Sequence, residues 1–265
     1  MLQTLRKYCE VYRIQIKNNL AREASYRTNF FTIALVDLVW ICVEFSLFKV
    51  IYANTPSLAG WRQEQVFFFL GVFFTSDALF TFLFQRNFWT FTDLVNRGEL
   101  DIFLTKPIHP LFLALTRWVN FSALFNLVLG IAISIFYAKA ADFLGGWKWI
   151  LFVSWLGIGL LTAILLRFAF AIWVFWTERS WAISQLYYHF FSFATKPDVI
   201  YPKIIRYTIL TALPFALIGS IPARALMTGL EIYEYFWLFG VLIVFFFFDR
   251  WMWRKGLKRY QSASS

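Results

Sequence analysis

The chain has 265 residues, of which 60% are hydrophobic, 22% aromatic and only 15% charged. A soluble domain has roughly 45–50% apolar and about 25% charged residues, so this composition excludes a soluble globular protein and predicts an all-α protein of the lipid bilayer. The net charge of +10 does not indicate nucleic-acid binding, because no basic patch is separate from the apolar segments. The two cysteines, Cys9 and Cys42, provide neither a disulfide framework nor a Cys-rich metal site.

The first segment, residues 1–28, is predicted to be an amphipathic helix in the membrane interface. Its apolar side chains recur every three or four residues, a spacing that places them on one face of a helix. Such a helix lies flat on the bilayer with its apolar face down, and a solvated helical lead-in is the alternative. The apolar face consists of Leu5, Cys9, Tyr12, Ile16 and Leu20.

Six membrane spans are expected, because about 20 helical residues cross ~30 Å of hydrocarbon. Five of them are clear, but residues 181–229 are interrupted by prolines and have two interpretations. In the first, 181–199 crosses and the Pro-rich segment 200–229 re-enters the outer leaflet. In the second, 205–222 crosses. The five clear spans are 29–52, 65–84, 111–137, 149–176 and 233–248.

The basic residues orient these spans with both termini in the cytoplasm. With 181–199 as the fifth span, sixteen Lys and Arg residues fall inside and eight outside, which is the asymmetry that membrane proteins show. With 205–222 as the fifth span the count becomes 19 against 5, so charge alone favours the second interpretation. Against it, Pro214 and Pro222 would disrupt the crossing helix.

The longest polar interruption between spans is the cytoplasmic segment 85–110. Its centre, 93–104, mixes charged residues with leucine, isoleucine, valine and phenylalanine, so it is too apolar for a free loop. Gly98 is expected to end one short helix, and Pro107 and Pro110 another. A short apolar helix here is suited to docking a soluble partner, and a loop that packs under its own bundle is the alternative.

One part of this segment resembles the G-x-L-D-x-x-L-x-K/R-P signature of a family. It reads Gly98-Glu99-Leu100-Asp101, followed by Leu104, Lys106-Pro107 and Pro110-Leu111. The family is that of the type-2 ABC exporter permeases, in an uncharacterised branch. The resemblance covers the whole chain: an amphipathic N-terminal helix, six spans, a cytoplasmic coupling helix between spans two and three, and a Pro-rich stretch before the last span.

The resemblance implies a transport subunit, not an enzyme, in the plasma (inner) membrane of a prokaryote. Such permeases pair with a second permease, identical or related, and with two copies of a separate ABC ATPase. The ATPase holds ATP and Mg, so no cofactor is expected in this chain, and the absence of a G-x-x-x-x-G-K-[ST] motif is consistent with that division. The substrate, which is moved outward, cannot be identified from the sequence.

The resemblance also implies roles for particular residues. The stretch 200–229 would form re-entrant gate helices, which decides for 181–199 as the fifth span, and its gate prolines are Pro202, Pro214 and Pro222. Within the coupling segment, Gly98 would turn the chain, and Leu100 and Leu104 would fill a groove on the ATPase. The expected ATPase-coupling residues are Asp93, Gly98, Glu99, Leu100, Asp101, Leu104, Lys106 and Pro107.

Charged residues inside the spans are further candidates, because each costs about 2.5–3.5 kcal/mol at the bilayer centre and needs a partner. Asp37, Asp77 and Arg167 all lie roughly 10–14 Å from the cytoplasmic ends of their spans at 1.5 Å per residue. We expect Arg167 to pair with one of these aspartates, and snorkelling of Arg167 to the interface is the alternative. Glu44 could line a polar path or pair with Lys49.

Two other functions remain open at this stage. A multispan enzyme acting on lipid could use Glu44, Asp77 or His109 as acid or base, but no polar cluster converges on one side of the membrane. An ion-coupled secondary transporter could use Asp37, Asp77 and Glu44 as proton sites, but such folds usually contain internal repeats and none is visible.

Overall fold

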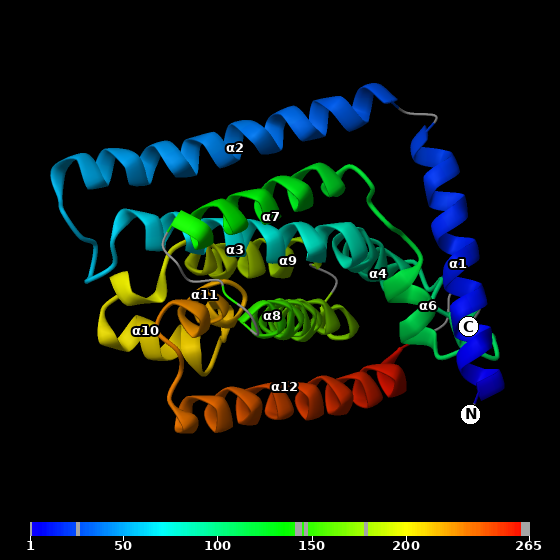
Figure 1. Cartoon of the computed structure of the whole chain (residues 1–265). Coiled ribbons are helices and arrows are strands. Elements are labelled where there is room, and N and C mark those ends of the chain that lie inside the picture. Colours follow the sequence, from blue (N-terminus) through cyan, green and yellow to red (C-terminus); the bar gives the residue numbers. More distant parts are fainter. Residues whose placement is uncertain (1, 25–26, 141–144, 146–147, 178–179, 261–265) are drawn as a thin grey trace.

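A computed structural model of the chain describes residues 2–24, 27–140, 145, 148–177 and 180–260, and in this part it is built of helices without a strand. Residues 25 and 26, at the end of the predicted interfacial helix, lie outside the described residues. The long helices α2, α3, α7 and α12 run in roughly the same direction, and α1 crosses one end of the bundle (Figure 1). Helix α8 packs against α3 and α12. The α-helices are α1 (Leu2–Ala24), α2 (Arg27–Asn54), α3 (Gln63–Phe80), α4 (Arg86–Asn96), α5 (Asp101–Leu104), α6 (Pro110–Thr116), α7 (Ala123–Ala140), α8 (Lys148–Ala171), α9 (Ser180–Phe191), α10 (Lys203–Leu210), α11 (Ser220–Met227) and α12 (Ile232–Arg259).

Three helical segments among the described residues are long and apolar enough to cross a membrane: Gln63–Asn96, Ile150–Phe175 and Ile232–Arg259. The helix α2 has 28 residues but carries Asp37, Glu44 and Lys49. Apolar helix α7 is shorter, with 18 residues. The structure therefore shows an all-helical protein suited to a membrane.

The second predicted span is longer than expected. Instead of ending at residue 84, α3 continues through a π-helical turn, η1 (Thr81–Gln85), into α4, which gives one helical segment of 34 residues. After Gly71 within α3, no glycine or proline occurs until Gly98, which adopts a φ of +71°. The first part of the expected cytoplasmic loop is therefore a direct extension of the helix.

The third predicted span, 111–137, is not one helix but two, α6 and α7. At the break, the Asn87 side chain donates to the carbonyl of Trp118 and accepts from its amide, both at 2.7 Å. The amide of Asn120 donates to the carbonyl of Phe82 at 2.9 Å. Because the α3–α4 segment satisfies these backbone groups, the chain can leave the helix without stranding polar atoms.

The Pro-rich region between α9 and α12 contains only short helices. α10 and α11 have eight residues each, so each is about 12 Å long and cannot cross a bilayer. They lie at the end of the bundle opposite α1 (Figure 1). No continuous helix covers 205–222, whereas α9 and the following 3₁₀ turn, η3 (Ser192–Thr195), form a helical stretch within 181–199.

The contact between α3 and α7 is the most extensive between two helices of the described chain. A Cβ added to Gly71 would lie 2.7 Å from the amide nitrogen of Ser134, and one added to Gly130 would lie 2.8 Å from that of Thr75. In each helix a glycine therefore stands four residues before a small hydroxyl residue, and each glycine faces the hydroxyl residue of the other helix. The two backbones approach closely because these four side chains are small.

We predict that Gly71→Val or Gly130→Val lowers the stability of the protein by about 1–3 kcal/mol or more, because the added methyl groups force these backbones apart. Thermal unfolding in detergent, followed by size-exclusion chromatography, measures the effect. Gly240→Val in α12 is the matched control, since nothing lies within 4 Å of an added Cβ there. Equal melting of Gly71→Val and Gly240→Val would contradict the packing account.

Candidate functional site

The short helix α5 lies between Gly98 and Pro107, at the same end of the bundle as α1 (Figure 1). After α4 ends, the amide of Glu99 donates to the carbonyl of Leu94 at 2.9 Å. This hydrogen bond requires a residue with a left-handed backbone conformation at the turn. Gly98 adopts that conformation without steric cost. The chain thus reverses directly into α5.

The apolar side chains of this segment, residues 98–107, divide between two faces. Leu100 and Phe103 are buried, at 0% and 5% exposure, whereas Ile102 and Leu104 are 55% and 38% exposed. Leu100, which we expected to fill a groove on a partner, is instead part of the core. A helical turn places residues three apart on one face, so Leu100 and Phe103 anchor α5 while Ile102 and Leu104 face outward.

The polar residues of the segment lie mostly at its surface. Asp93, Glu99, Lys106 and Pro107 are exposed, and Asp101 is half-buried. Of the eight residues expected to contact a partner, most are therefore accessible on one side of the molecule.

The phenol of Tyr260, which follows α12, caps the start of α5. Its oxygen accepts a hydrogen bond from the amide of Leu100 at 3.1 Å. Burial raises the pKa of Tyr260, so the group stays a neutral phenol at physiological pH. No pattern in the sequence predicts this contact, because 160 residues separate the two partners.

An aromatic cluster behind Tyr260 joins the ends of three helical segments. The ring centroids of neighbouring pairs in this cluster lie 5.8–6.3 Å apart, and its members are Phe91 of α4, Phe168 of α8, Phe175 of η2 (Ile172–Phe175) and Trp253 of α12. A Cβ at Gly256 would lie 2.4 Å from the ring of Phe175. The segment containing α5 is therefore fixed to a densely packed aromatic layer.

Helix α1 holds the other side of the segment. Lys7 donates to the carbonyl of Pro107 at 3.1 Å, and the amide of His109 donates to the hydroxyl of Tyr8 at 3.0 Å. Farther along, Asn19 donates to the carbonyl of Arg117 at 2.8 Å. Polar side chains of α1 therefore attach this helix to the segment from Pro107 to Arg117.

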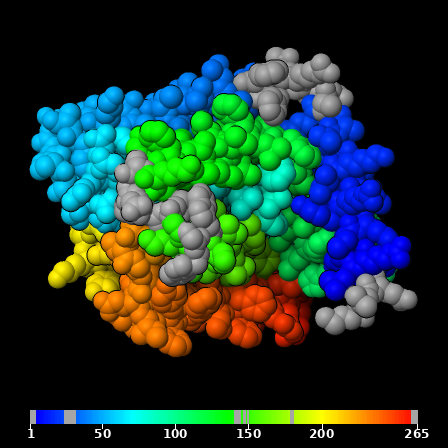
Figure 2. All heavy atoms as spheres, viewed as in Figure 1, coloured from blue at the N-terminus to red at the C-terminus, as the bar shows by residue number. Residues whose placement is uncertain are grey.

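Some apolar side chains of α1 are exposed beside these contacts. Leu5 and Leu20 are 55% and 52% exposed, and Cys9 on the same side of the helix is exposed as well. Of the apolar stripe expected on this helix, Tyr12 and Ile16 are half-buried. The face directly opposite the contacts carries exposed charged residues, Arg6, Glu10 and Lys17. α1 lies on the surface at one end of the molecule (Figure 2), where Leu5, Cys9 and Leu20 can contact a membrane interface.

Arg167 of α8 does not form the ion pair that we expected with Asp37 or Asp77. It is 1% exposed, and among the described residues it has no carboxylate partner. Its guanidinium lies over the rings of Tyr187 and Tyr188, with centroids at 4.6 and 5.2 Å. The ring faces of α9 attract the cation and replace the missing carboxylate.

The intramembrane carboxylates have other partners. Asp37 accepts a hydrogen bond from the side-chain amide of Asn126 at 2.6 Å. Glu44 forms an ion pair with Lys196 and not with Lys49. Lys196 follows α9, so this pair ties the outer half of α2 to the fifth predicted span.

Two acidic residues of α3 and α12 stand apart from these pairs. Asp77 is half-buried, and its electrostatic interactions are with Asp37 and Tyr187. Asp249 is 4% exposed, and neither of its carboxylate oxygens has a hydrogen-bond partner among the described residues. Asp249 directly follows the last predicted span, 233–248.

An ion-pair network holds the Pro-rich region together. Asp198, at 0% exposure, pairs with Arg206 at 2.8 Å and lies 4.0 Å from Arg224. Arg224 also pairs with Glu234 of α12 at 2.5 Å. The amide of Asp198 donates to the hydroxyl of Ser220 at 2.7 Å. These contacts place α10 and α11 against the start of α12.

The three prolines expected to form a gate all begin helical turns. Pro202 precedes α10, Pro214 precedes the 3₁₀ turn η5 (Phe215–Leu217), and Pro222 lies in the first turn of α11. A first-turn residue needs no amide hydrogen, so proline fits there without breaking a helical hydrogen bond. The prolines therefore divide this region into short helices.

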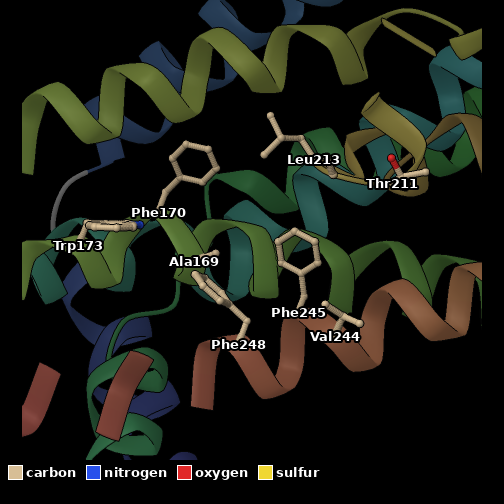
Figure 3. A pocket seen from close by; sticks show the side chains of 9 residues that line it. Ala169, Phe170, Trp173, Thr211, Leu213, Val244, Phe245 and Phe248 are labelled. Carbon is tan, nitrogen blue, oxygen red and sulfur yellow. The ribbon is translucent and has the colours of Figure 1, made fainter. Parts of the chain in front are cut away.

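An apolar cavity of about 450 Å³ lies between α8, the turn after α10, and α12. Figure 3 shows Phe170 and Trp173 on one side and Phe245 and Phe248 on the other, with Leu213 above them. The hydroxyl of Thr211 and the indole nitrogen of Trp173 are the polar side-chain groups of its lining. The cavity is suited to an apolar chain or ring. Among the described residues, no group of three or more His, Cys, Asp or Glu side chains could hold a metal ion.

We predict that Tyr260→Phe exposes the amides of residues 100–104 to exchange about tenfold faster, because a buried amide that loses its acceptor costs about 1–3 kcal/mol. Hydrogen exchange with mass spectrometry measures the change. Tyr233→Phe, at the exposed start of α12, is the control. Unchanged exchange in Tyr260→Phe would show that the phenol does not hold α5.

We predict that charge reversal does not rescue Arg167. Arg167→Asp combined with Asp37→Arg or Asp77→Arg should yield no more folded protein than the single changes, because Arg167 is held by tyrosine rings. Tyr187→Phe should keep most of the stability, and Tyr187→Leu should lose about 2 kcal/mol or more. The yield of folded protein after size-exclusion chromatography measures the outcome. A higher yield in either double variant than in the single variants would restore the ion-pair hypothesis.

Comparison with known protein families assigns the chain to one of them. The model of the ABC-2 family transporter proteins matches residues 38–264 and thus most of the chain. No curated protein and no solved structure matches it.

Proposed function

Because the chain belongs to the ABC-2 transporter family, a family of membrane permeases, we propose that it is the permease subunit of an ATP-driven exporter. A separate ATPase would supply the energy and hold ATP and Mg. The observation that carries this proposal is the exposed pair Ile102 and Leu104 on α5, which is anchored from below by Leu100 and Phe103. Two apolar side chains on a fixed cytoplasmic helix are suited to insertion into a groove of a soluble partner.

In the proposed topology six spans cross the plasma membrane of a prokaryote, with both termini in the cytoplasm. The spans are α2, the α3–α4 segment, α7, α8, α9 with η3, and α12. The excess of basic residues near α1, α4 and the end of α12 supports this orientation. The shortness of α10 and α11 supports a re-entrant gate in the outer leaflet at 200–229.

The energy of ATP would reach the membrane through α5. Helix α3–α4 is one segment of 34 residues, so a displacement of its cytoplasmic end also moves its membrane part. Tyr260 and the aromatic layer connect the same segment to α8 and α12. A push on α5 by the closing ATPase would therefore act on three spans together.

The complex is proposed to contain two ATPase copies and a second permease, identical or related. In support, only 17% of the most apolar stretch of α12 is buried by the rest of the described chain. The exposed faces of α2 and α12 are apolar, which suits both lipid and a neighbouring permease. The cavity of Figure 3 lies beside α12 and would accept the apolar part of a substrate from this side.

We predict that Ile102→Asp or Leu104→Asp leaves the chain inserted in the membrane but weakens its ATPase contact about tenfold or more, because a charge replaces an apolar side chain in the groove. Co-purification of the ATPase and its substrate-stimulated activity are the measurements. Leu104→Met, which conserves volume and polarity, is the matched control.

Normal ATPase stimulation in both aspartate variants would refute the role of α5. If no ATPase co-purifies with the unaltered chain in mild detergent, the alternatives of a lipid-modifying enzyme or an ion-coupled transporter gain support. Mass spectrometry of the native complex would establish whether the second permease is identical.

A further inference from the structure

Three arginines surround a single indole at the junction of α1, α4 and α6. The guanidinium carbons of Arg22, Arg86 and Arg117 lie 4.2, 4.8 and 4.9 Å from the ring centroid of Trp118. Any two of these charges therefore lie within about 10 Å of each other, where like charges repel. Stacking on the ring attracts each cation but does not neutralise it. The cluster is suited to an anion.

A hollow of about 590 Å³ opens beside this cluster, between α1 and the segment that contains α5. Its lining includes Arg22, Arg117 and Lys106, against one carboxylate, Glu99. Among the described residues, neither Lys106 nor Arg117 forms an ion pair. The hollow thus carries an excess of positive charge, and Trp118 is part of its lining.

The carboxylate of Glu23, near the cluster, already accepts two hydrogen bonds from the backbone. Glu23 follows Arg22 in the chain, but its two oxygens accept the amides of Phe121 and Ser122 at 2.9 and 3.0 Å. These amides are at the start of α7, where a helix favours a negative charge. Glu23 therefore stabilises the start of α7, and it is not part of the lining of the hollow.

The position of the hollow indicates what kind of anion reaches it. α1 crosses one end of the bundle (Figure 1) and exposes Leu5, Cys9 and Leu20 on one side, which suits a helix at the membrane surface. Arg22 lies about one turn before α2, the first helix of the bundle. In the proposed orientation the hollow is at the level of the lipid headgroups of the cytoplasmic leaflet.

We propose that this hollow binds the phosphate of an anionic phospholipid headgroup from the cytoplasmic leaflet. The guanidinium groups of Arg22 and Arg117 and the ammonium of Lys106 provide donors and charge, and the Trp118 ring orients the arginines. The inference goes beyond the proposed function: it rests on the membrane orientation and does not involve ATP. A bound lipid would join α1 to the segment containing α5.

The experiment measures lipid retention by the full chain without any ATPase. Native mass spectrometry counts phosphatidylglycerol that stays bound after exchange into neutral detergent, and titration with a short-chain phosphatidylglycerol gives a Kd. Arg117→Gln with Lys106→Gln should remove the retained lipid and raise the Kd about tenfold or more, because two charge-assisted contacts are lost. Equal retention in the variant and the unaltered chain would overturn the proposal.

Two variants separate charge from folding. Arg117→Lys keeps the charge and should keep most of the binding, and binding as weak as in Arg117→Gln would overturn the proposal. Lys255→Gln is the matched control, because Lys255 lies 4.4 Å from the ring centroid of Trp251 but stands outside the cluster. It should retain the lipid. Lys106→Gln alone, at an exposed position, tests the site if Arg117→Gln does not fold.

Two further arms distinguish other occupants. Inorganic phosphate that displaces the short-chain lipid at equal concentration would assign the hollow to a soluble anion and overturn its assignment to lipid. A double variant that keeps its lipid but loses a co-expressed ATPase would make the cluster a protein contact, which also overturns the proposal.

Discussion

The close approach of α3 and α7 is the constraint on which the rest of the structure depends. Gly71 and Gly130 each lie against the backbone of the other helix, so larger side chains cannot be accommodated at either position. Helix α3 is thereby fixed in the centre of the bundle, with most of its side chains buried. Because α4 continues α3 without a break, the same contact determines where Asn87 meets Trp118 and where the chain leaves the helix between α6 and α7.

From this centre the helix extends to the end of the bundle where α5 is attached at both sides. The phenol of Tyr260 and the aromatic layer hold it from the side of α12, and α1 holds the residues that follow it. Such a segment cannot move independently of the bundle. In the proposed exporter this is the property that a coupling helix needs, since a flexible loop would absorb the force of the ATPase.

The charges within the bundle are stabilised by partners on other segments of the chain. Arg167 lies over two tyrosines of α9, Glu44 pairs with Lys196, and Asp198 is held by Arg206 and Arg224. Each interaction connects two different segments, so the charges act as tertiary contacts and not as an isolated polar path. Asp249, without a hydrogen-bond partner among the described residues, is the exception.

The sequence by itself determined the bilayer environment, the helical class and the place of the short helix α5, because composition, Gly98 and Pro107 act locally. Only the tertiary structure decided which face of α5 is free, where the span 111–137 breaks and what holds Arg167. These features depend on Leu100 meeting Tyr260, on Asn87 meeting Trp118 and on Arg167 meeting Tyr187. Hydrophobic periodicity cannot reveal such pairs, because helix packing brings them together and chain proximity does not.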